Sequence, residues 1–177
     1  MSTLQNKRIA VLKGGPGSER EVSHASAAGV AGALKSLGAE VVDLDVTGLG
    51  FELPQGIDFV FNIIHGTLGE DGQLQRELER RGVRYTGEGV EGSELAFDKL
   101  KAKKRFVERG VPTANYEIVK AGAAPSLPLP YVLKAPCEGS SVGVYIVKTP
   151  EEIAPAVEGA AKYADELLDA TLHSLPG

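Results

Sequence analysis

The loop within residues 131–148 carries the clearest chemical signal in the sequence. Two β-prone runs flank it, Lys134 precedes it, and it contains Glu138, Ser140 and Ser141 together with two glycines. Glycines let a backbone approach an anion closely, hydroxyls and amides donate hydrogen bonds to it, and lysine supplies positive charge. The pattern therefore predicts a phosphate-binding loop. It is not the common P-loop, because the lysine precedes the glycines. A β-hairpin whose glycines satisfy the turn geometry is the alternative.

Two further polar loops follow apolar runs nearer the N-terminus. His65 comes directly after the buried-strand pattern of residues 59–64. It is suited to binding a carboxylate or moving a proton near neutral pH, and a structural histidine bonded to the loop backbone is the alternative. Glu21 lies three residues after Ser18, a spacing that favours a capping box at a helix start. The other interpretation of Glu21 is a carboxylate held at a strand end to meet a substrate amine.

Lys99 begins a lysine-rich helix predicted over residues 98–109. A cation at a helix start is slightly unfavourable against the helix dipole, so Lys99 favours an anionic partner; a solvated side chain is the alternative. Glu70 and Asp71 are expected to order their loop and start the next helix. Two adjacent carboxylates without a third ligand make a weak metal signal, and no metal site is predicted.

Alternating strand and helix patterns must position these residues. Strands are predicted at residues 8–12, 40–45, 59–64 and 83–85, and helices at residues 22–37 and 73–81, with Gly38 as the first C-cap. This order predicts a mostly parallel sheet with helices packed on it. Beyond a boundary near Phe97 the sequence predicts a helix at 98–109, strands at 116–119 and 165–168, a proline-containing loop at 121–130, a hairpin at 131–148 and a helix from Thr149 to about Ala164.

Composition narrows the class of protein. The 177 residues are 42% hydrophobic and 24% charged, which is typical of a soluble globular protein. The net charge of −5 argues against general nucleic-acid binding. A single cysteine excludes an intrachain disulfide and fits a reducing compartment. No apolar run has the length of a signal peptide or a membrane span, so we expect a cytoplasmic protein without membrane partners.

Taken together and in order, the polar clusters resemble the D-alanine–D-alanine ligases of the ATP-grasp superfamily. The residues that carry the resemblance are Gly14-Gly15, Glu19–Ser23, Ile64–Gly66, Gly69–Gly72, Gln75, Tyr85–Gly87, Gly89-Val90, Asp98-Lys99, Pro112-Thr113, Lys134 and Glu138–Gly143. The resemblance covers roughly residues 7–168 and implies an α/β fold in two parts. Residues 1–97 would form a Rossmann-like, parallel-sheet pre-ATP-grasp domain that binds substrate. Residues 98–168 would form a small α+β lobe, the central nucleotide-binding subdomain of the ATP-grasp fold, and residues 169–177 a divergent tail.

The resemblance also implies a reaction. ATP would phosphorylate the carboxylate of one D-alanine, and the amine of a second would attack the D-alanyl phosphate to give D-alanyl-D-alanine for peptidoglycan synthesis. Glu21 would bind the ammonium of the first substrate, His65 would lie near its carboxylate, and Ser140 would bond to Glu21, so that Glu21 and Ser140 act as catalytic residues. ATP would be bound by Lys99, Lys134, Glu138 and Ser141.

The family continues into a further C-terminal lobe that holds magnesium ligands and the rest of the adenine pocket. No Asp…Glu-x-Asn set follows residue 165, so we expect the lobe to be missing and the chain to be a truncated, inactive portion of the ligase. ATP and Mg are implied for the parent enzyme, as is a homodimer. The alternatives are a non-catalytic binding or oligomerisation module, or a ligase that joins D-alanine to a hydroxy acid.

Overall fold

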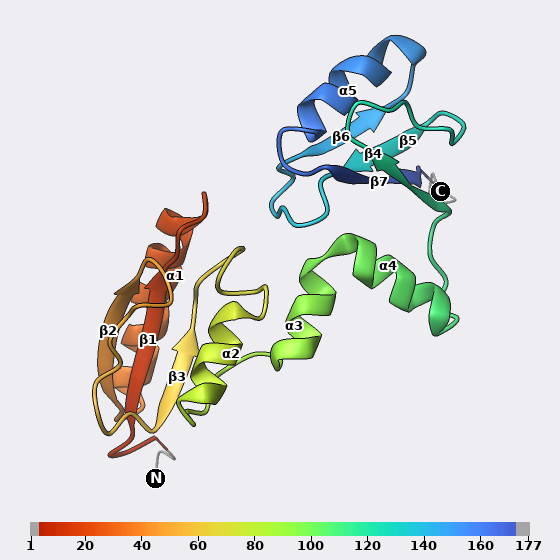
Figure 1. The fold of residues 1–177 in the computed structure, drawn as a ribbon. Coiled ribbons are helices and arrows are strands. Elements are labelled where there is room, and N and C mark those ends of the chain that lie inside the picture. The colour runs from red at the N-terminus through yellow and green to blue at the C-terminus, as the bar shows by residue number, and fades with distance from the viewer. Residues whose placement is uncertain (1–3, 173–177) are drawn as a thin grey trace. The chain divides into compact units, whose positions relative to one another are not determined.

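The computed structural model describes residues 4–172, and the chain divides into two compact units, Met1–Leu95 and Ala96–Gly177. The first unit contains a three-stranded parallel sheet (Figure 1). Its strands are β1 (Arg8–Gly14), β2 (Glu40–Val46) and β3 (Phe59–Asn62), in the order β2-β1-β3. Its helices are α1 (Arg20–Ser36), α2 (Gln73–Arg80) and α3 (Val90–Phe97), the last of which extends into the second unit.

Apolar side chains pack on both faces of this sheet. On one face α2 contributes Leu74 and Leu78, which pack with Leu12 and Val60 of the strands. On the other face α1 covers the sheet. Alternation along β1 sends successive side chains to opposite faces, so one strand supplies both cores. All its strands run parallel, so β1 and β3 end at the same edge of the sheet, where ligands of open α/β sheets bind.

The second unit is built on an antiparallel sheet in the order β4-β7-β5-β6. Its elements are α4 (Lys99–Glu108), β4 (Tyr116–Lys120), β5 (Tyr131–Lys134), β6 (Val144–Val147), a 3-10 turn (Pro150–Glu152), α5 (Ile153–Ala160) and β7 (Glu166–Thr171). Asp98 caps α4 by accepting hydrogen bonds from the backbone N–H groups of Leu100 and Lys101. α5 covers one face of the sheet (Figure 1).

The predicted α/β fold class is confirmed, including the hairpin formed by β5 and β6. Besides the helix α3, which the sequence does not predict, three expected elements have other bounds or another form. The helix expected to reach Ala164 ends at Ala160. The strand expected at residues 83–85 is a single parallel bridge between Tyr85 and Val60. The final strand was expected over residues 165–168 but continues to Thr171, while residues 173–177 of the expected tail lie outside the described residues. None of the helices in residues 4–172 is both long and apolar enough to cross a membrane.

Candidate functional site

The loops that follow β1 and β3 lie side by side at one edge of the parallel sheet. A methyl group built on Gly66 would come within 3.7 Å of the carboxylate of Glu19, which belongs to the other loop. Gly15 adopts a φ of +91°, and a methyl group there would lie 2.6 Å from the side chain of Ile64. Glycine is therefore required for the two loops to approach this closely.

Ser23 anchors the first turns of α1 to both of these strands. Its side chain is fully buried, and its hydroxyl accepts a hydrogen bond from the backbone N–H of Gly14 at 2.9 Å. The same hydroxyl donates to the carbonyl of Ile63 at 2.6 Å. One serine thus satisfies a polar group at the end of β1 and another just beyond β3. This anchoring determines where the start of the helix, and with it Glu21, is held.

Glu21 is exposed, and its side chain makes no hydrogen bond or ion pair with any other described residue. The prediction of a capping box between Ser18 and Glu21 is wrong. α1 begins at Arg20 after Glu19, which makes no side-chain capping bond. Arg20 is instead held by an ion pair with Asp45 and a 3.3 Å hydrogen bond to the carbonyl of Gly15. The carboxylate of Glu21 is consequently available to bind a cation.

His65 presents one ring nitrogen without a partner. Its Nδ1 lies 3.5 Å from Oε1 of Glu70, whereas its Nε2 is buried and has no hydrogen-bond partner among the described residues. No ring nitrogen of His65 bonds to the backbone within the described part of the chain, so the alternative of a histidine bonded to its own loop does not hold. A buried imidazole nitrogen lacking a partner is costly, and a polar ligand would relieve that cost.

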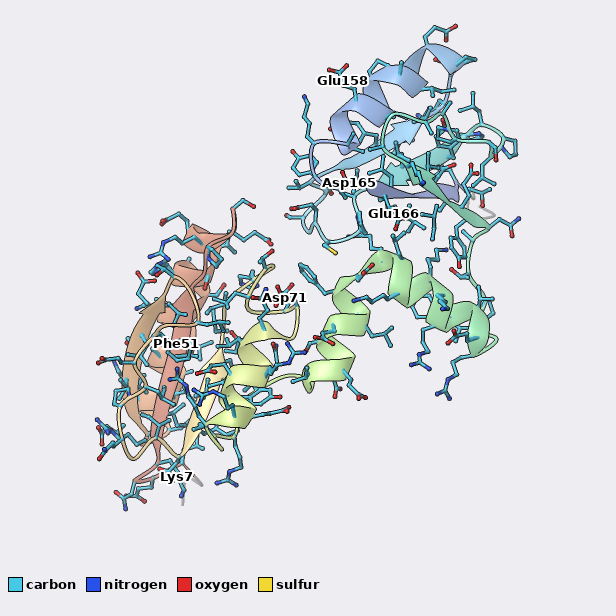
Figure 2. The ribbon with its side chains drawn as sticks, viewed as in Figure 1. Lys7, Phe51, Asp71, Glu158, Asp165 and Glu166 are labelled. Carbon is cyan, nitrogen blue, oxygen red and sulfur yellow. The ribbon has the colours of Figure 1, made fainter. Side chains whose placement is uncertain are left out.

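The loop around His65 is ordered by Asp71, as the sequence predicts. The Asp71 carboxylate accepts hydrogen bonds from the backbone N–H groups of Leu68 at 3.0 Å and Gln73 at 3.1 Å. It lies directly before α2 (Figure 2). Residues 4–172 contain no group of three or more His, Cys, Asp or Glu side chains that could hold a metal ion.

In the second unit, the loop between β5 and β6 combines a regular base with an unusual tip. The N–H of Ala135 bonds to the carbonyl of Gly143 at 2.9 Å, which continues the hairpin. Ser140 and Ser141 then adopt φ values of +50° and +68°. Two successive non-glycine residues in the left-handed region are rare outside functional sites, because each costs about 1–3 kcal/mol. The hairpin alternative is therefore correct for the base and insufficient for the tip, where Ser140 and Ser141 are exposed.

Lys99 is the first residue of α4, and its hydrogen bonds hold the β5–β6 loop against the start of that helix. Its backbone N–H donates to the carbonyl of Pro136 at 3.1 Å. Its ammonium donates to the carbonyls of Glu138 at 2.5 Å and Pro136 at 3.2 Å. Burial lowers the pKa of this ammonium, and the charge of Lys134 lowers it further. Lys99 and Lys134 thus lie near each other, as two residues that bind one polyanion must.

Lys103 is a third cation of this cluster that the sequence interpretation missed. Its ammonium donates to Oγ1 of Thr113 at 2.5 Å and to the carbonyl of Ala114 at 2.9 Å. Burial and then the charge of Lys134 lower its pKa. The sequence interpretation assigns Lys103 no role beyond its place in the lysine-rich helix predicted over residues 98–109. The spacing of four residues from Lys99, which places both on one side of a helix, was the available signal.

The roles expected for the remaining candidates stay predictions. The side chains of Glu138, Ser140 and Ser141 make no hydrogen bond to another described residue. The bond expected between Ser140 and Glu21 would join residues of the two units, and it also stays a prediction.

Comparisons with known proteins agree with this arrangement. The family model described as D-ala D-ala ligase N-terminus matches residues 47–88, and the model described as D-ala D-ala ligase C-terminus matches residues 102–170. A D-alanine–D-alanine ligase of Geobacter sulfurreducens is 45% identical, over 93% of this chain and 54% of its own length. One from Haemophilus ducreyi is 42% identical, over 98% of this chain and 62% of its own length. The crystal structure of D-alanyl-alanine synthetase A from Vibrio cholerae superposes with a TM-score of 0.81 at 28% identity, covering 97% of this chain and 61% of that one.

These matches, with the parallel-sheet unit and the α+β unit that follows it, define an ATP-grasp type of α/β protein. The chain belongs to the D-alanine–D-alanine ligase family, of which it covers N-terminal and central regions. It spans between 54% and 62% of the length of the curated relatives it matches.

Proposed function

We propose that the parent protein of this chain is an ATP-dependent ligase that joins two D-alanine molecules for peptidoglycan synthesis. The observation that carries the proposal is the cluster of Lys99, Lys103 and Lys134 beside the left-handed serines of the β5–β6 loop. None of these lysines forms an ion pair with a carboxylate in residues 4–172. A concentration of ammonium groups without carboxylate partners, next to hydroxyls and glycines, suits the phosphates of a nucleotide.

In this function, Glu21 binds the ammonium group of the first D-alanine, and Nε2 of His65 faces its carboxylate. Both residues stand at the edge of the parallel sheet, and both have unused bonding capacity. Ser140 bonds to Glu21 and helps orient the substrate. Lys99, Lys134, Glu138 and Ser141 hold ATP, which when bound supplies the phosphoryl group that activates the substrate carboxylate.

Magnesium, which the family implies, does not fit residues 4–172 in the same way. No three potential ligands gather there, so we derive no step through this ion. For that reason we also propose that the 177 residues by themselves do not form the dipeptide. Incubation with ATP, magnesium and D-alanine should give no phosphate above the background of a heat-denatured sample. Sustained, D-alanine-dependent phosphate release would refute this part of the proposal.

The substrate half of the proposal can be tested without catalysis. Titration of the full chain with D-alanine should shift the NMR resonances of the loops around Glu21 and His65, and L-alanine should shift them less. Glu21→Gln should abolish the shifts, because the amide cannot pair with the ammonium group. Glu91→Gln changes another exposed glutamate of the same unit and should leave them unaltered. Equal shifts in wild type and Glu21→Gln would exclude the proposed role of Glu21.

We propose that the partner of this chain is a second copy of itself, in a homodimer formed through the first unit. An apolar groove on this unit is lined by Leu34, Phe59 and Phe61. Its lining also includes Lys7 and Asp58, which form a 3.0 Å ion pair with each other, so a two-fold-related copy would meet an apolar surface bordered by a neutralised charge pair (Lys7 is labelled in Figure 2). Sedimentation velocity should show the dimer mass, and Phe61→Asp should convert the dimer to a monomer. A wild-type chain that remains monomeric at high concentration would refute the dimer.

A further inference from the structure

Asp169 is a buried acid that the proposed reaction does not use. It lies at the centre of the antiparallel sheet, on the strand β7 that pairs with both β4 and β5. Its side chain is fully buried, and among residues 4–172 neither carboxylate oxygen receives a well-formed hydrogen bond, although the carboxyl group of Glu117 is near enough to share a proton with it. Its cross-strand neighbours are Glu117 on β4 and Leu133 on β5. An ionised carboxylate in such a place would be strongly destabilising.

Glu117 is the charged group that faces Asp169. Its carboxylate accepts hydrogen bonds from the backbone N–H and hydroxyl of Ser126, at 2.6 and 2.7 Å, and from the N–H of Leu127 at 2.8 Å. Burial opposes ionisation of Glu117, but these hydrogen bonds outweigh burial and hold its pKa below the usual value. Glu117 therefore keeps its negative charge. Burial, and then that charge, raise the pKa of Asp169 to about 7.

The other elements packed around Asp169 offer no compensating charge within the described residues. From β5 comes Tyr131, whose hydroxyl is buried without a partner and whose pKa is raised by burial and by the two carboxylates. From α5 come the uncharged side chains of Ala156, Val157 and Ala160. Two carboxyl groups thus face each other across the β4–β7 pair, and only one of them can readily be ionised.

We propose that protonation of Asp169 keeps β7 paired between β4 and β5 and thereby positions Lys134. We call this pH-dependent stabilisation of β7 the latch. The protonated carboxyl group donates to Glu117, which relieves the unpaired oxygen. Loss of the proton leaves two facing negative charges in a sheet without a cation. Lys134 follows Leu133 on β5 and pairs with Leu168 of β7, so a loosened β7 displaces it. The consequence for Lys134 rests on the proposed nucleotide site, whereas the latch itself does not.

The direction of the pH effect follows from the raised pKa. A carboxyl group with a folded-state pKa near 7 and an unfolded value of 3.8 stabilises the sheet fully at the lower value. That stabilisation is lost as the pH rises towards 7, and it is absent above that pH. Within this window the equilibrium constant for opening the sheet rises up to tenfold per pH unit. An ordinary exposed aspartate would give no such dependence.

Amide hydrogen exchange on the full chain tests the latch. Protection factors for β5 and β7 amides should fall between pH 5 and pH 7 in wild type, while those of β1 in the first unit serve as an internal reference. Asp169→Asn keeps the size and removes the charge, so it should show no such fall. Asp165→Asn, at an exposed position just before β7 (Figure 2), should behave like wild type. A fall of equal size in Asp169→Asn, or none in wild type, would overturn the latch.

A direct titration covers the case in which Asp169→Asn does not fold. The side-chain carboxyl ¹³C resonance of Asp169 in the wild-type chain should titrate near pH 7, and Glu117→Gln should lower that midpoint. A wild-type midpoint near 4 would overturn the proposal. The amide resonance of Lys134 should titrate with the Asp169 midpoint if the latch positions it, and a flat response would remove that consequence. These readouts need no nucleotide, so failure of the latch and failure of the nucleotide site give different results.

Discussion

Substitution of Ser23 by alanine is the sharpest test of what anchors the start of α1, and with it Glu21, at the edge of the parallel sheet. The change removes the hydroxyl that bonds to the N–H of Gly14 and to the carbonyl of Ile63. The site is fully buried, so water cannot readily replace either bond. Leaving a buried polar group unpaired costs about 1–3 kcal/mol, and the change leaves two such groups, while alanine regains up to about 0.7 kcal/mol of helix propensity. A net loss of about 1–5 kcal/mol is therefore expected.

Urea denaturation followed by circular dichroism measures this loss. Ser26→Ala is the matched control, because Ser26 lies on the same helix with an exposed side chain and gains the same helix propensity. The difference between the two variants isolates the two buried hydrogen bonds. Ser23→Ala should also weaken the response of Glu21 to D-alanine, since the anchored turn carries that residue. A difference below about 0.5 kcal/mol would refute the reasoning, because it is smaller than the net worth of a single typical hydrogen bond.

Other substitutions and a titration extend these tests. Gly69→Ala should destabilise the chain by about 3 kcal/mol or more, since the new methyl group would lie 2.0 Å from the carbonyl oxygen of Ile64. Gly29→Ala on α1 should instead raise the urea midpoint by the equivalent of about 1 kcal/mol, because no atom of another described segment lies within 4 Å of its new methyl group; a lower midpoint would contradict this. Burial, followed by the hydrogen bond to Glu79, raises the pKa of Tyr85 to about 12, so the Tyr85 contribution to stability should be lost between pH 10 and 12. Absorbance titration should show a tyrosinate step near pH 12 that Tyr85→Phe removes, and its persistence in the variant would contradict the assignment.

The sequence predicts helices and strands well where apolar residues recur with a regular period. It predicts them less well where contacts of individual residues decide whether a short helix forms or where a helix ends. The first helix and the strands around it follow regular patterns of apolar residues, and the structure confirms them. The helix Val90–Phe97 was missed, because its eight residues include Gly92 and show no clear apolar stripe. The last helix ends at Ala160, since the N–H of Tyr163 bonds back to the carbonyl of Ala160 in a turn. Sequence alone gives no account of that turn.

The candidate site was predictable in its members but not in their bonding. Strand ends followed by glycines and polar residues led to Glu21, His65 and the β5–β6 loop. The spacing of Ser18 and Glu21 suggested a capping box, and the helix starts without one because Arg20 is drawn to Asp45 and Gly15. A pairing between residues so distant in sequence is decided by the tertiary fold, which a local spacing rule does not include.

The bonding of the three lysines bears on how an acidic chain can hold an anion. The ammonium groups of Lys99 and Lys103 donate to neutral oxygens of Glu138 and Ala114, and neither forms an ion pair with a carboxylate in residues 4–172. Carbonyl oxygens orient these cations without neutralising them. Lys134 adds a third charge that lowers the pKa of both. Mutual repulsion raises the energy of this partly buried cluster of cations, and a bound anion would lower it. A net charge of −5 over the whole chain is therefore compatible with a locally cationic phosphate site.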